Sequence, residues 1–161
     1  MRKIKKKSKS KEKKLEKAEE KILDVENVDS QTNYQVEKIK NAVQGLYYIS
    51  ETDAEILPFE GKKTEVVTKE ELLSQTGNAG NLTVEEKDFA EFFARLTEIQ
   101  DWFEDEEKET AQKFAQLKEL LEKNLRDLKA FKVGKIQLDV YVVGLNNEGK
   151  LLGIKTKAVE T

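Results

Sequence analysis

The sequence predicts an α+β fold in which helices cover a small antiparallel sheet. Two observations support it. Through the middle of the chain apolar residues recur at helical spacing, and in the last thirty residues they change to the period of two that is typical of strands. A length of 161 residues suits one domain. The order of predicted elements is helix, short strand, three helices and a C-terminal β-hairpin.

The first 31 residues are expected to form a basic extension, disordered or frayed-helical, outside a domain at 32–161. Residues 1–17 hold ten Lys or Arg and two Glu, a net charge of +8; the whole chain carries −3, so the remainder carries −11. The extension is either a solvated tail or a tether to an anionic surface. It contains no apolar run of signal-peptide or transmembrane length, which favours a cytoplasmic protein.

Composition excludes several classes of active site. The chain has no cysteine, so it has neither a disulfide framework nor a thiolate nucleophile. It also has no histidine, which excludes Ser-His-Asp catalysis and most zinc sites. An acidic body repels nucleic acid and attracts basic proteins. A binding protein is therefore favoured over an enzyme.

The first helix of the domain is expected to begin at Thr32 and to end near Gly45. Thr32 and Gln35 have capping-box spacing. One face of this helix is apolar, with Val36, Ile39, Ala42 and Val43. Residues 46–49 then enter the core, and a polar loop follows that contains Glu51.

A short strand is expected at 56–59, at the edge of the sheet, because Pro58 cannot donate a ladder hydrogen bond. A turn is expected at Gly61. Beyond it, the capping pair Thr68 and Glu71 predicts a second helix, which Gly77 ends in a left-handed conformation.

Thr83 and Glu86 predict the start of a third helix. Its buried side is expected to carry Phe89, Phe92, Phe93 and Leu96, as core residues rather than as a cofactor site.

The stretch QDWFEDEE at 100–107 contains the only tryptophan of the chain among carboxylates. One interpretation is structural: Asp101 caps a long helix that runs to about Leu128, Glu104 completes a capping box, and the acids suit the helix dipole. That helix has an apolar face of Ala111, Phe114, Leu117, Leu121, Leu125 and Leu128. The crowded acids also repel one another, which favours a second interpretation: Trp102 is an anchor aimed at a basic partner.

The C-terminal residues predict a hairpin with one buried face. Apolar positions alternate with polar ones from Ile136 to Val142, residues 146–149 form the turn, and a second strand returns through residues 152–158.

Several of these segments together resemble the nuclease A inhibitor family, whose members inhibit sugar-nonspecific DNA/RNA nucleases. They are QDWFEDEE, KIQLDVYVVG and GKLLGIKTKAVET, with GLYYISET and SQTG upstream. The resemblance extends over roughly Gln35 to Thr161. It implies an α-β-α sandwich, no catalytic activity, and a nuclease partner whose active site holds a divalent metal.

The resemblance also implies the partner-binding residues, each of which matches the family in type: Glu51, Gln100, Asp101, Trp102 and Thr161. The acids that follow are expected to steer association: Glu104, Asp105, Glu106 and Glu107. The chain departs from the family at Phe103, where tyrosine is usual, in the loop at 53–63, and in its basic tail.

No cofactor of its own is expected. A terminal threonine offers hydroxyl and carboxylate oxygens, and the resemblance implies that Thr161 is a ligand to the Mg²⁺ of the nuclease in the complex. We expect a monomer whose folded domain binds no nucleic acid directly. Two alternatives stay open: an acidic cation-binding or scaffold protein without a nuclease partner, and a hydrolase that uses carboxylates alone.

Overall fold

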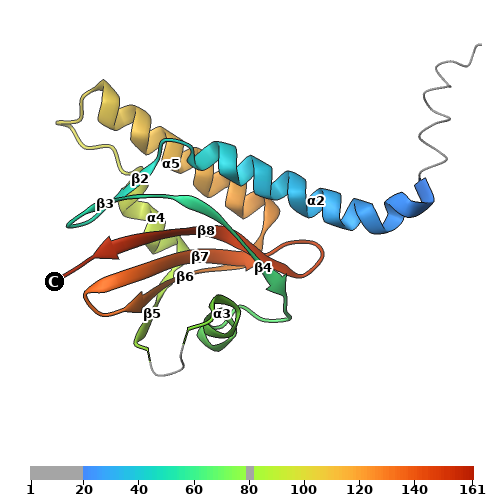
Figure 1. Ribbon diagram of the computed structural model, residues 1–161. Helices are drawn as coiled ribbons and strands as arrows, with labels where there is room; N and C mark the ends of the chain where they lie inside the picture. The colour runs from blue at the N-terminus through green and yellow to red at the C-terminus, as the bar shows by residue number, and fades with distance from the viewer. Residues whose placement is uncertain (1–19, 79–81) are drawn as a thin grey trace, which may run out of the picture. The chain divides into compact units, whose positions relative to one another are not determined.

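The computed structural model describes residues 20–78 and 82–161 (Figure 1). Its elements in chain order are α2 (Glu20–Val43), β2 (Tyr47–Ile49), β3 (Asp53–Glu55), β4 (Leu57–Lys63), α3 (Lys69–Thr76), β5 (Val84–Asp88), α4 (Phe89–Thr97), α5 (Asp105–Asn124), β6 (Arg126–Gly134), β7 (Gln137–Leu145) and β8 (Lys150–Val159). The lysine-rich segment 1–19, expected to be disordered or frayed-helical, lies outside the described residues.

The chain divides after Tyr34. Residues Gln35–Thr161 form one compact unit, and the helical residues before Gln35 belong to another. The division falls within α2, whose last residues, including Ile39 and Val43, pack in the core of the larger unit.

The larger unit contains a five-stranded antiparallel sheet with strand order β4-β8-β7-β6-β5. The predicted C-terminal hairpin is present as β7 and β8, which pair from Gln137 opposite Val159 to Leu145 opposite Leu151. Gly149 in its turn has a φ of 79°, a conformation that favours glycine. Strand β8 lies between β4 and β7, so it borders residues far earlier in the chain: Leu57 pairs with Lys155 and Lys63 pairs with Lys150.

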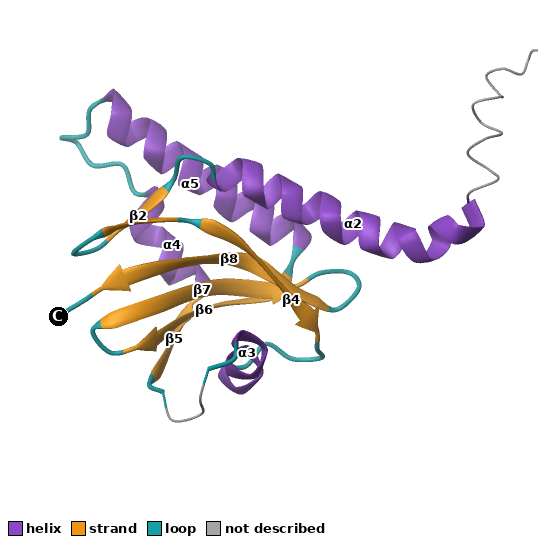
Figure 2. Ribbon diagram, viewed as in Figure 1, coloured by secondary structure: helices purple, strands orange, loops and turns teal. Residues whose placement is uncertain are grey.

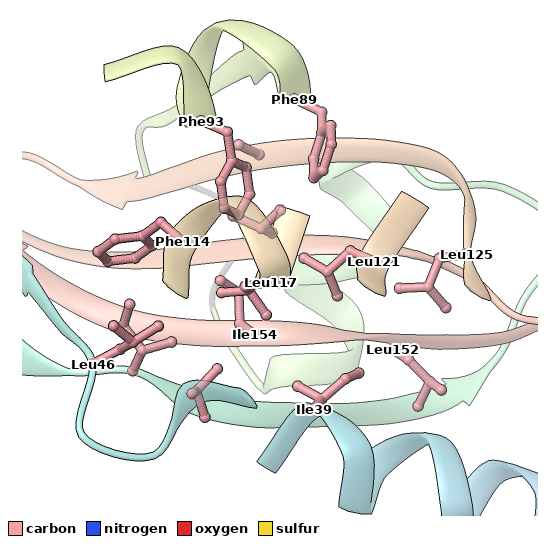
Figure 3. Packing of buried hydrophobic residues seen from close by; sticks show 14 residues of the cluster. Ile39, Leu46, Phe89, Phe93, Phe114, Leu117, Leu121, Leu125, Leu152 and Ile154 are labelled. Atoms are coloured by element: carbon pink, nitrogen blue, oxygen red, sulfur yellow. The ribbon is translucent and has the colours of Figure 1, made fainter. Parts of the chain in front are cut away.

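Helices cover both faces of this sheet, with α4 and α5 on one face and α3 on the other (Figure 2). The α4–α5 side holds the larger cluster of buried residues (Figure 3), in which Phe93, Leu117 and Leu121 are fully buried against Val142 and Leu152 of the sheet. This arrangement confirms the α+β class and the α-β-α sandwich.

Strand β7 is buried on both faces, whereas the sequence predicted only one. Val142 packs toward α4 and α5, while Tyr141 and Val143 pack toward α3. The prediction was wrong because α3 covers the second face. Ile136, expected to be buried in this strand, lies in the turn before it and is 56 % exposed.

Three predictions in the first half of the domain were wrong. Residues 46–49 were expected to enter the core, but Tyr47 and Ile49 of β2 are exposed. Helix α2 begins at Glu20 within the described residues, so Thr32 lies inside it and does not cap it. Gly61 lies within β4, at an irregularity between Glu60 and Lys63, and makes no turn. A Cβ at Gly61 would collide with the Gln75 amide oxygen, which accepts a hydrogen bond of 2.7 Å from the Lys62 amide.

Other predictions there are confirmed. Strand β4 is an edge strand and contains Pro58, although it spans Leu57–Lys63 rather than 56–59. Helix α3 begins after Thr68, whose hydroxyl accepts a 3.1 Å hydrogen bond from the Glu71 amide. It ends at Gly77, whose φ is 75°.

The predicted helix start at Thr83 was wrong, because Val84–Asp88 is a strand paired with β6. Helix α4 starts at Phe89, and its N-cap is Asp88 rather than Thr83. There the Asp88 carboxylate accepts a 3.1 Å hydrogen bond from the Glu91 amide, with the same spacing that Thr83 and Glu86 have in the sequence. Phe89 and Phe93 are buried as predicted.

The bounds of the long helix were also wrong. Its N-cap is Glu104 rather than Asp101, and it ends at Asn124 rather than near Leu128. Leu125 and Leu128 keep helical spacing in the sequence and contact the same core, but Leu128 does so from strand β6. The backbone changes direction at Asp127, where φ is 57° and the pairing of β6 with β7 is irregular.

Candidate functional site

The hairpin formed by β2 and β3 presents Glu51 at its turn. The turn is closed by the Ser50 amide, which donates a 2.8 Å hydrogen bond to the Thr52 carbonyl. Tyr48 fixes the hairpin to α4, because its ring stacks on Phe92 with centroids 5.7 Å apart and planes 6° from parallel. Glu51 therefore projects from a short sheet that is anchored in the protein interior.

The same turn holds the end of β8. The Glu51 amide donates a 3.2 Å hydrogen bond to the Val159 carbonyl, and the Val159 amide donates a 3.0 Å hydrogen bond to the Ser50 hydroxyl. These two bonds place residues 159–161 directly beside the Glu51 side chain.

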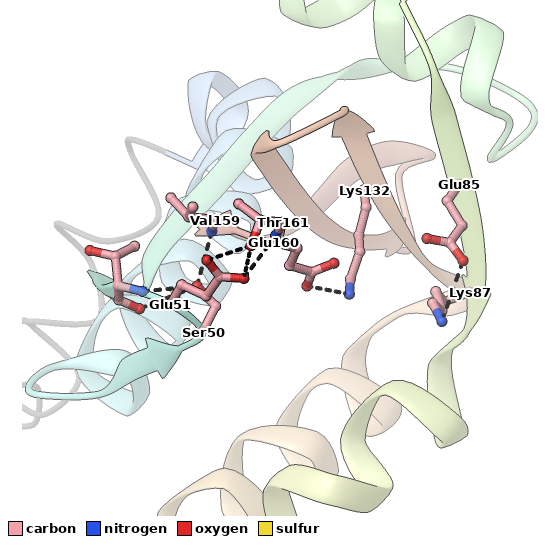
Figure 4. Close-up of polar contacts among 9 residues, drawn as sticks. Ser50, Glu51, Glu85, Lys87, Lys132, Val159, Glu160 and Thr161 are labelled. Atoms are coloured by element: carbon pink, nitrogen blue, oxygen red, sulfur yellow. Dashed lines mark hydrogen bonds and ion pairs between the residues drawn. The ribbon is translucent and has the colours of Figure 1, made fainter.

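The Glu51 carboxylate accepts hydrogen bonds from both the backbone amide and the side-chain hydroxyl of Thr161 (Figure 4). The Thr161 amide donates to one carboxylate oxygen of Glu51 at 2.7 Å, and the Thr161 hydroxyl lies 2.9 and 3.0 Å from the two oxygens. Hydrogen bonds from the Thr161 amide and then from its hydroxyl lower the pKa of the Glu51 carboxyl below its ordinary value. The carboxylate is therefore held in its charged form.

Glu160, between Val159 and Thr161, is fixed from the opposite side. Its amide donates a 3.0 Å hydrogen bond to the Ile136 carbonyl, and its carboxylate lies 2.8 Å from the Lys132 ammonium. All three residues after Ala158 are thus tied to neighbouring segments. Neither Lys132 nor Ser50 was found from the sequence, because their partners lie 28 and 109 residues away.

The second group of predicted residues lies in the loop between α4 and α5. A 3.1 Å hydrogen bond from the Phe103 amide to the Gln100 carbonyl closes a turn, with Asp101 and Trp102 at its two central positions. Trp102 is 67 % exposed. Its ring meets the Phe103 ring edge-on, with centroids 4.7 Å apart, so the partly buried Phe103 supports it from below.

The acids that follow this turn, at 104–107, help to stabilise the start of α5. The Glu104 amide donates a 2.9 Å hydrogen bond to the Glu107 carboxylate, which satisfies an amide at the start of α5. Asp105 and Glu106 lie in the first helical turn, where negative charge is favourable. All four acids at 104–107 are nevertheless exposed, so they remain available to a partner.

The structure brings Glu51 and Thr161 into contact and keeps Gln100, Asp101 and Trp102 together on a separate loop. The two groups are linked through the stacked pair Tyr48 and Phe92, since Tyr48 precedes the Glu51 turn and Phe92 lies on the helix that leads to Gln100.

Over residues 20–78 and 82–161 there is no group of three or more carboxylates placed to hold a metal ion. None of the helices in this part of the chain is long and apolar enough to span a membrane.

Comparison with known proteins identifies the family. A comparison with curated proteins finds no match. A scan against family models matches residues 33–161 to the family described as nuclease A inhibitor-like protein. The matched range begins two residues before the compact unit Gln35–Thr161 and ends with it. It covers most of the chain and includes every predicted partner-binding residue, and so the chain belongs to the nuclease A inhibitor-like family.

Proposed function

We propose that this protein inhibits a sugar-nonspecific, divalent-metal-dependent DNA/RNA nuclease by blocking its active site. Membership of an inhibitor family supports a binding function rather than catalysis. The net charge of −3, with basic residues concentrated at 1–17, leaves the folded unit acidic. Such a surface is attracted to the basic groove in which a nuclease binds the phosphate backbone of its substrate.

The contact between Glu51 and Thr161 is the observation that carries this proposal. The family resemblance implies both residues as partner contacts, and although 110 positions separate them in the sequence, they touch in the fold. The amide and the hydroxyl of Thr161 both donate to the Glu51 carboxylate, the amide at 2.7 Å, and the two residues thus form one exposed polar group. A group held in one arrangement before binding loses less conformational entropy when it enters an active site.

The oxygens of Thr161 suit a hard divalent cation. In the structure its hydroxyl hydrogen is directed at Glu51, so the lone pairs of the hydroxyl oxygen stay available. Mg²⁺ prefers oxygen ligands and in nucleases contacts phosphate oxygens of the substrate. The hydroxyl and main-chain oxygens of Thr161 would hold the nuclease's metal, and the Glu51 carboxylate would hold Thr161.

Trp102 supplies the apolar part of the proposed interface. An exposed tryptophan supported by an aromatic neighbour is typical of a residue that is buried on binding. The exposed acids at 104–107 lie directly beside it and would steer the approach to a basic groove. Gln100 and Asp101, in the same turn, would supply polar contacts beside the ring.

The proposal is tested by titrating a sugar-nonspecific, Mg²⁺-dependent nuclease with the purified 161-residue protein. We expect activity to fall in proportion to added protein and to reach its minimum near an equimolar ratio. A variant that combines Trp102→Ala with Thr161→Gly is the control and should inhibit far less. Excess Mg²⁺ should not restore activity, because restoration would mean that the protein removes metal from solution. Full activity of every such nuclease at a large excess of protein would overturn the proposal.

A further inference from the structure

Lys132 makes an ion pair that crosses a strand. It lies on β6, whereas its partner Glu160 follows β8, and β7 separates these two strands in the sheet. The Lys132 side chain is only 13 % exposed, and its ammonium lies 2.8 Å from the Glu160 carboxylate (Figure 4). Among the ion pairs of the described residues this lysine has the least exposed side chain.

Glu160 is the carboxylate that pairs directly with Lys132, because the other acid nearby pairs with a different lysine. Glu85 lies opposite Lys132 in the pairing of β5 with β6, but its carboxylate is 3.4 Å from Lys87. Burial alone would lower the pKa of Lys132. The hydrogen bond with Glu160 and the nearby Tyr48, Glu160 and Glu85 outweigh that effect, so the pKa is raised. The ammonium therefore stays charged well above neutral pH.

Glu160 sits between the two residues that the Glu51 turn holds. Val159 is bound to Ser50 and Glu51 on one side, and Thr161 is bound to Glu51. The Glu160 side chain points to the other side, toward Lys132, so the backbone is held from both directions. Within residues 20–78 and 82–161, the one other bond from Glu160 to a different segment is that of its amide with the Ile136 carbonyl.

We propose that Lys132 is a positioning residue for inhibition, acting through Glu160 to fix the backbone of Thr161 in the orientation that its bonds to Glu51 require. This inference rests on the proposed function. It assigns a role in binding to a residue whose own side chain is mostly buried.

Three variants test it. Lys132→Met keeps the aliphatic stem and removes the charge, Lys132→Arg keeps the charge, and Lys129→Met is the matched control. Lys129 lies on the same strand and is 3.7 Å from Glu86, and its ammonium also donates a 3.0 Å hydrogen bond to the Val67 carbonyl. The control therefore removes a comparable lysine that has no connection with Thr161.

The first measurement concerns Thr161 itself and needs no nuclease. We expect Lys132→Met to speed amide hydrogen exchange at Thr161 by about tenfold, the factor that corresponds to one charge-assisted hydrogen bond. Its heteronuclear NOE should also fall. Lys129→Met should change neither the exchange rate nor the NOE of Thr161. This should hold even if Lys129→Met lowers the melting temperature as much as Lys132→Met does.

The second measurement is the inhibition constant. Lys132→Met should weaken inhibition about tenfold, Lys132→Arg should recover most of it, and Lys129→Met should have little effect. The loss should vanish when Lys132→Met is combined with deletion of Thr161, because the two changes then remove the same contact.

The outcomes separate the two proposals. A parent protein that inhibits no nuclease while Lys132→Met still loosens Thr161 refutes the proposed function and leaves the structural role of Lys132 supported. A parent that inhibits, with a Lys132→Met variant whose Thr161 amide and inhibition constant are unchanged, overturns the positioning role. Full additivity with the Thr161 deletion would also overturn it.

Discussion

The Glu51 carboxylate accepts hydrogen bonds from two donors of Thr161, the amide and the hydroxyl, and the hydroxyl lies within 3.0 Å of both carboxylate oxygens. Such an arrangement depends on the charge of the carboxylate. Protonation would remove part of its accepting capacity and weaken both contacts.

The first prediction concerns pH. Because the pKa of Glu51 is lowered in the folded protein, the contact contributes stability above the ordinary glutamate range, and this contribution is lost as the pH falls through the lowered pKa. The Thr161 amide proton, followed by NMR during acid titration, should therefore shift with a midpoint below that of an unperturbed glutamate. In Thr161→Ala, which keeps the amide and loses the hydroxyl, the midpoint should move part of the way back up. A midpoint in the parent at the ordinary value would contradict the contact.

The second prediction concerns Trp102. Trp102→Ala should weaken binding to the nuclease by about 2–4 kcal/mol, mostly through faster dissociation, since a buried aromatic contact is lost. The melting temperature should hardly change, because the side chain is 67 % exposed in the free protein. Surface-based binding kinetics measure both rates.

Ile99→Ala is the matched control for Trp102, as Ile99 lies in the same loop and is 48 % exposed. It should bind nearly as well as the parent. Equal affinity of Trp102→Ala and the parent would show that the tryptophan is not part of the interface.

The third prediction separates steering from contact. Asp105→Asn combined with Glu106→Gln should lower the association rate and its dependence on salt more than it changes the dissociation rate. These two acids are chosen because Glu107 accepts the capping hydrogen bond from Glu104. Stopped-flow association at several salt concentrations is the measurement.

The control for steering changes the net charge by the same amount on the same helix. Glu119→Gln with Glu122→Gln removes two acids from the second half of α5, where they pair with Lys123 and Lys118. An equal drop in association rate for both double variants would point to net charge alone rather than to the acids beside Trp102.

The fourth prediction concerns Ile136, whose carbonyl accepts the hydrogen bond from the Glu160 amide. Its side chain is 56 % exposed and borders residues 159–161, so a nuclease that engages Thr161 should cover it as well. Ile136→Ser should then cost about 1 kcal/mol of binding free energy, from the apolar area left unburied. Titration calorimetry measures the difference.

Val66→Ser provides the comparison, since Val66 is 52 % exposed and lies in the segment before α3. It should bind like the parent. A weaker complex for Val66→Ser than for Ile136→Ser would place the partner on the α3 side of the protein.

Local signals in the sequence predicted the elements whose ends are set locally. The Thr68 cap and Gly77 bounded α3 correctly because both act within one helical turn. The same spacing misled at Thr83, where pairing with β6 makes a strand and the Asp88 cap starts the helix instead. The spacing of Leu128 was misleading for a similar reason. A residue at that position reaches the same core whether the helix continues or strand β6 begins, and the pairing of β6 in the sheet determines that it is a strand.

In the candidate site too, residues marked by local sequence could be predicted, whereas residues whose role depends on distant partners could not. Trp102 stood out from its own neighbours, because one aromatic residue among acids is visible in eight consecutive letters. Ser50 and Lys132 could not be found in this way. Ser50 owes its role to an amide 109 residues away, and Lys132 owes its role to a carboxylate beyond an intervening strand.

Strand β8 lies between β4 and β7, and this position sets the order in which the site can be made during translation. Glu51 leaves the ribosome more than a hundred residues before Thr161, yet β4, which follows it closely, has no sheet partner until β8 emerges. The Trp102 turn can form earlier, from contacts within its own loop. In a nascent chain the Trp102 turn would thus form before the Glu51–Thr161 contact, which needs the whole of β8.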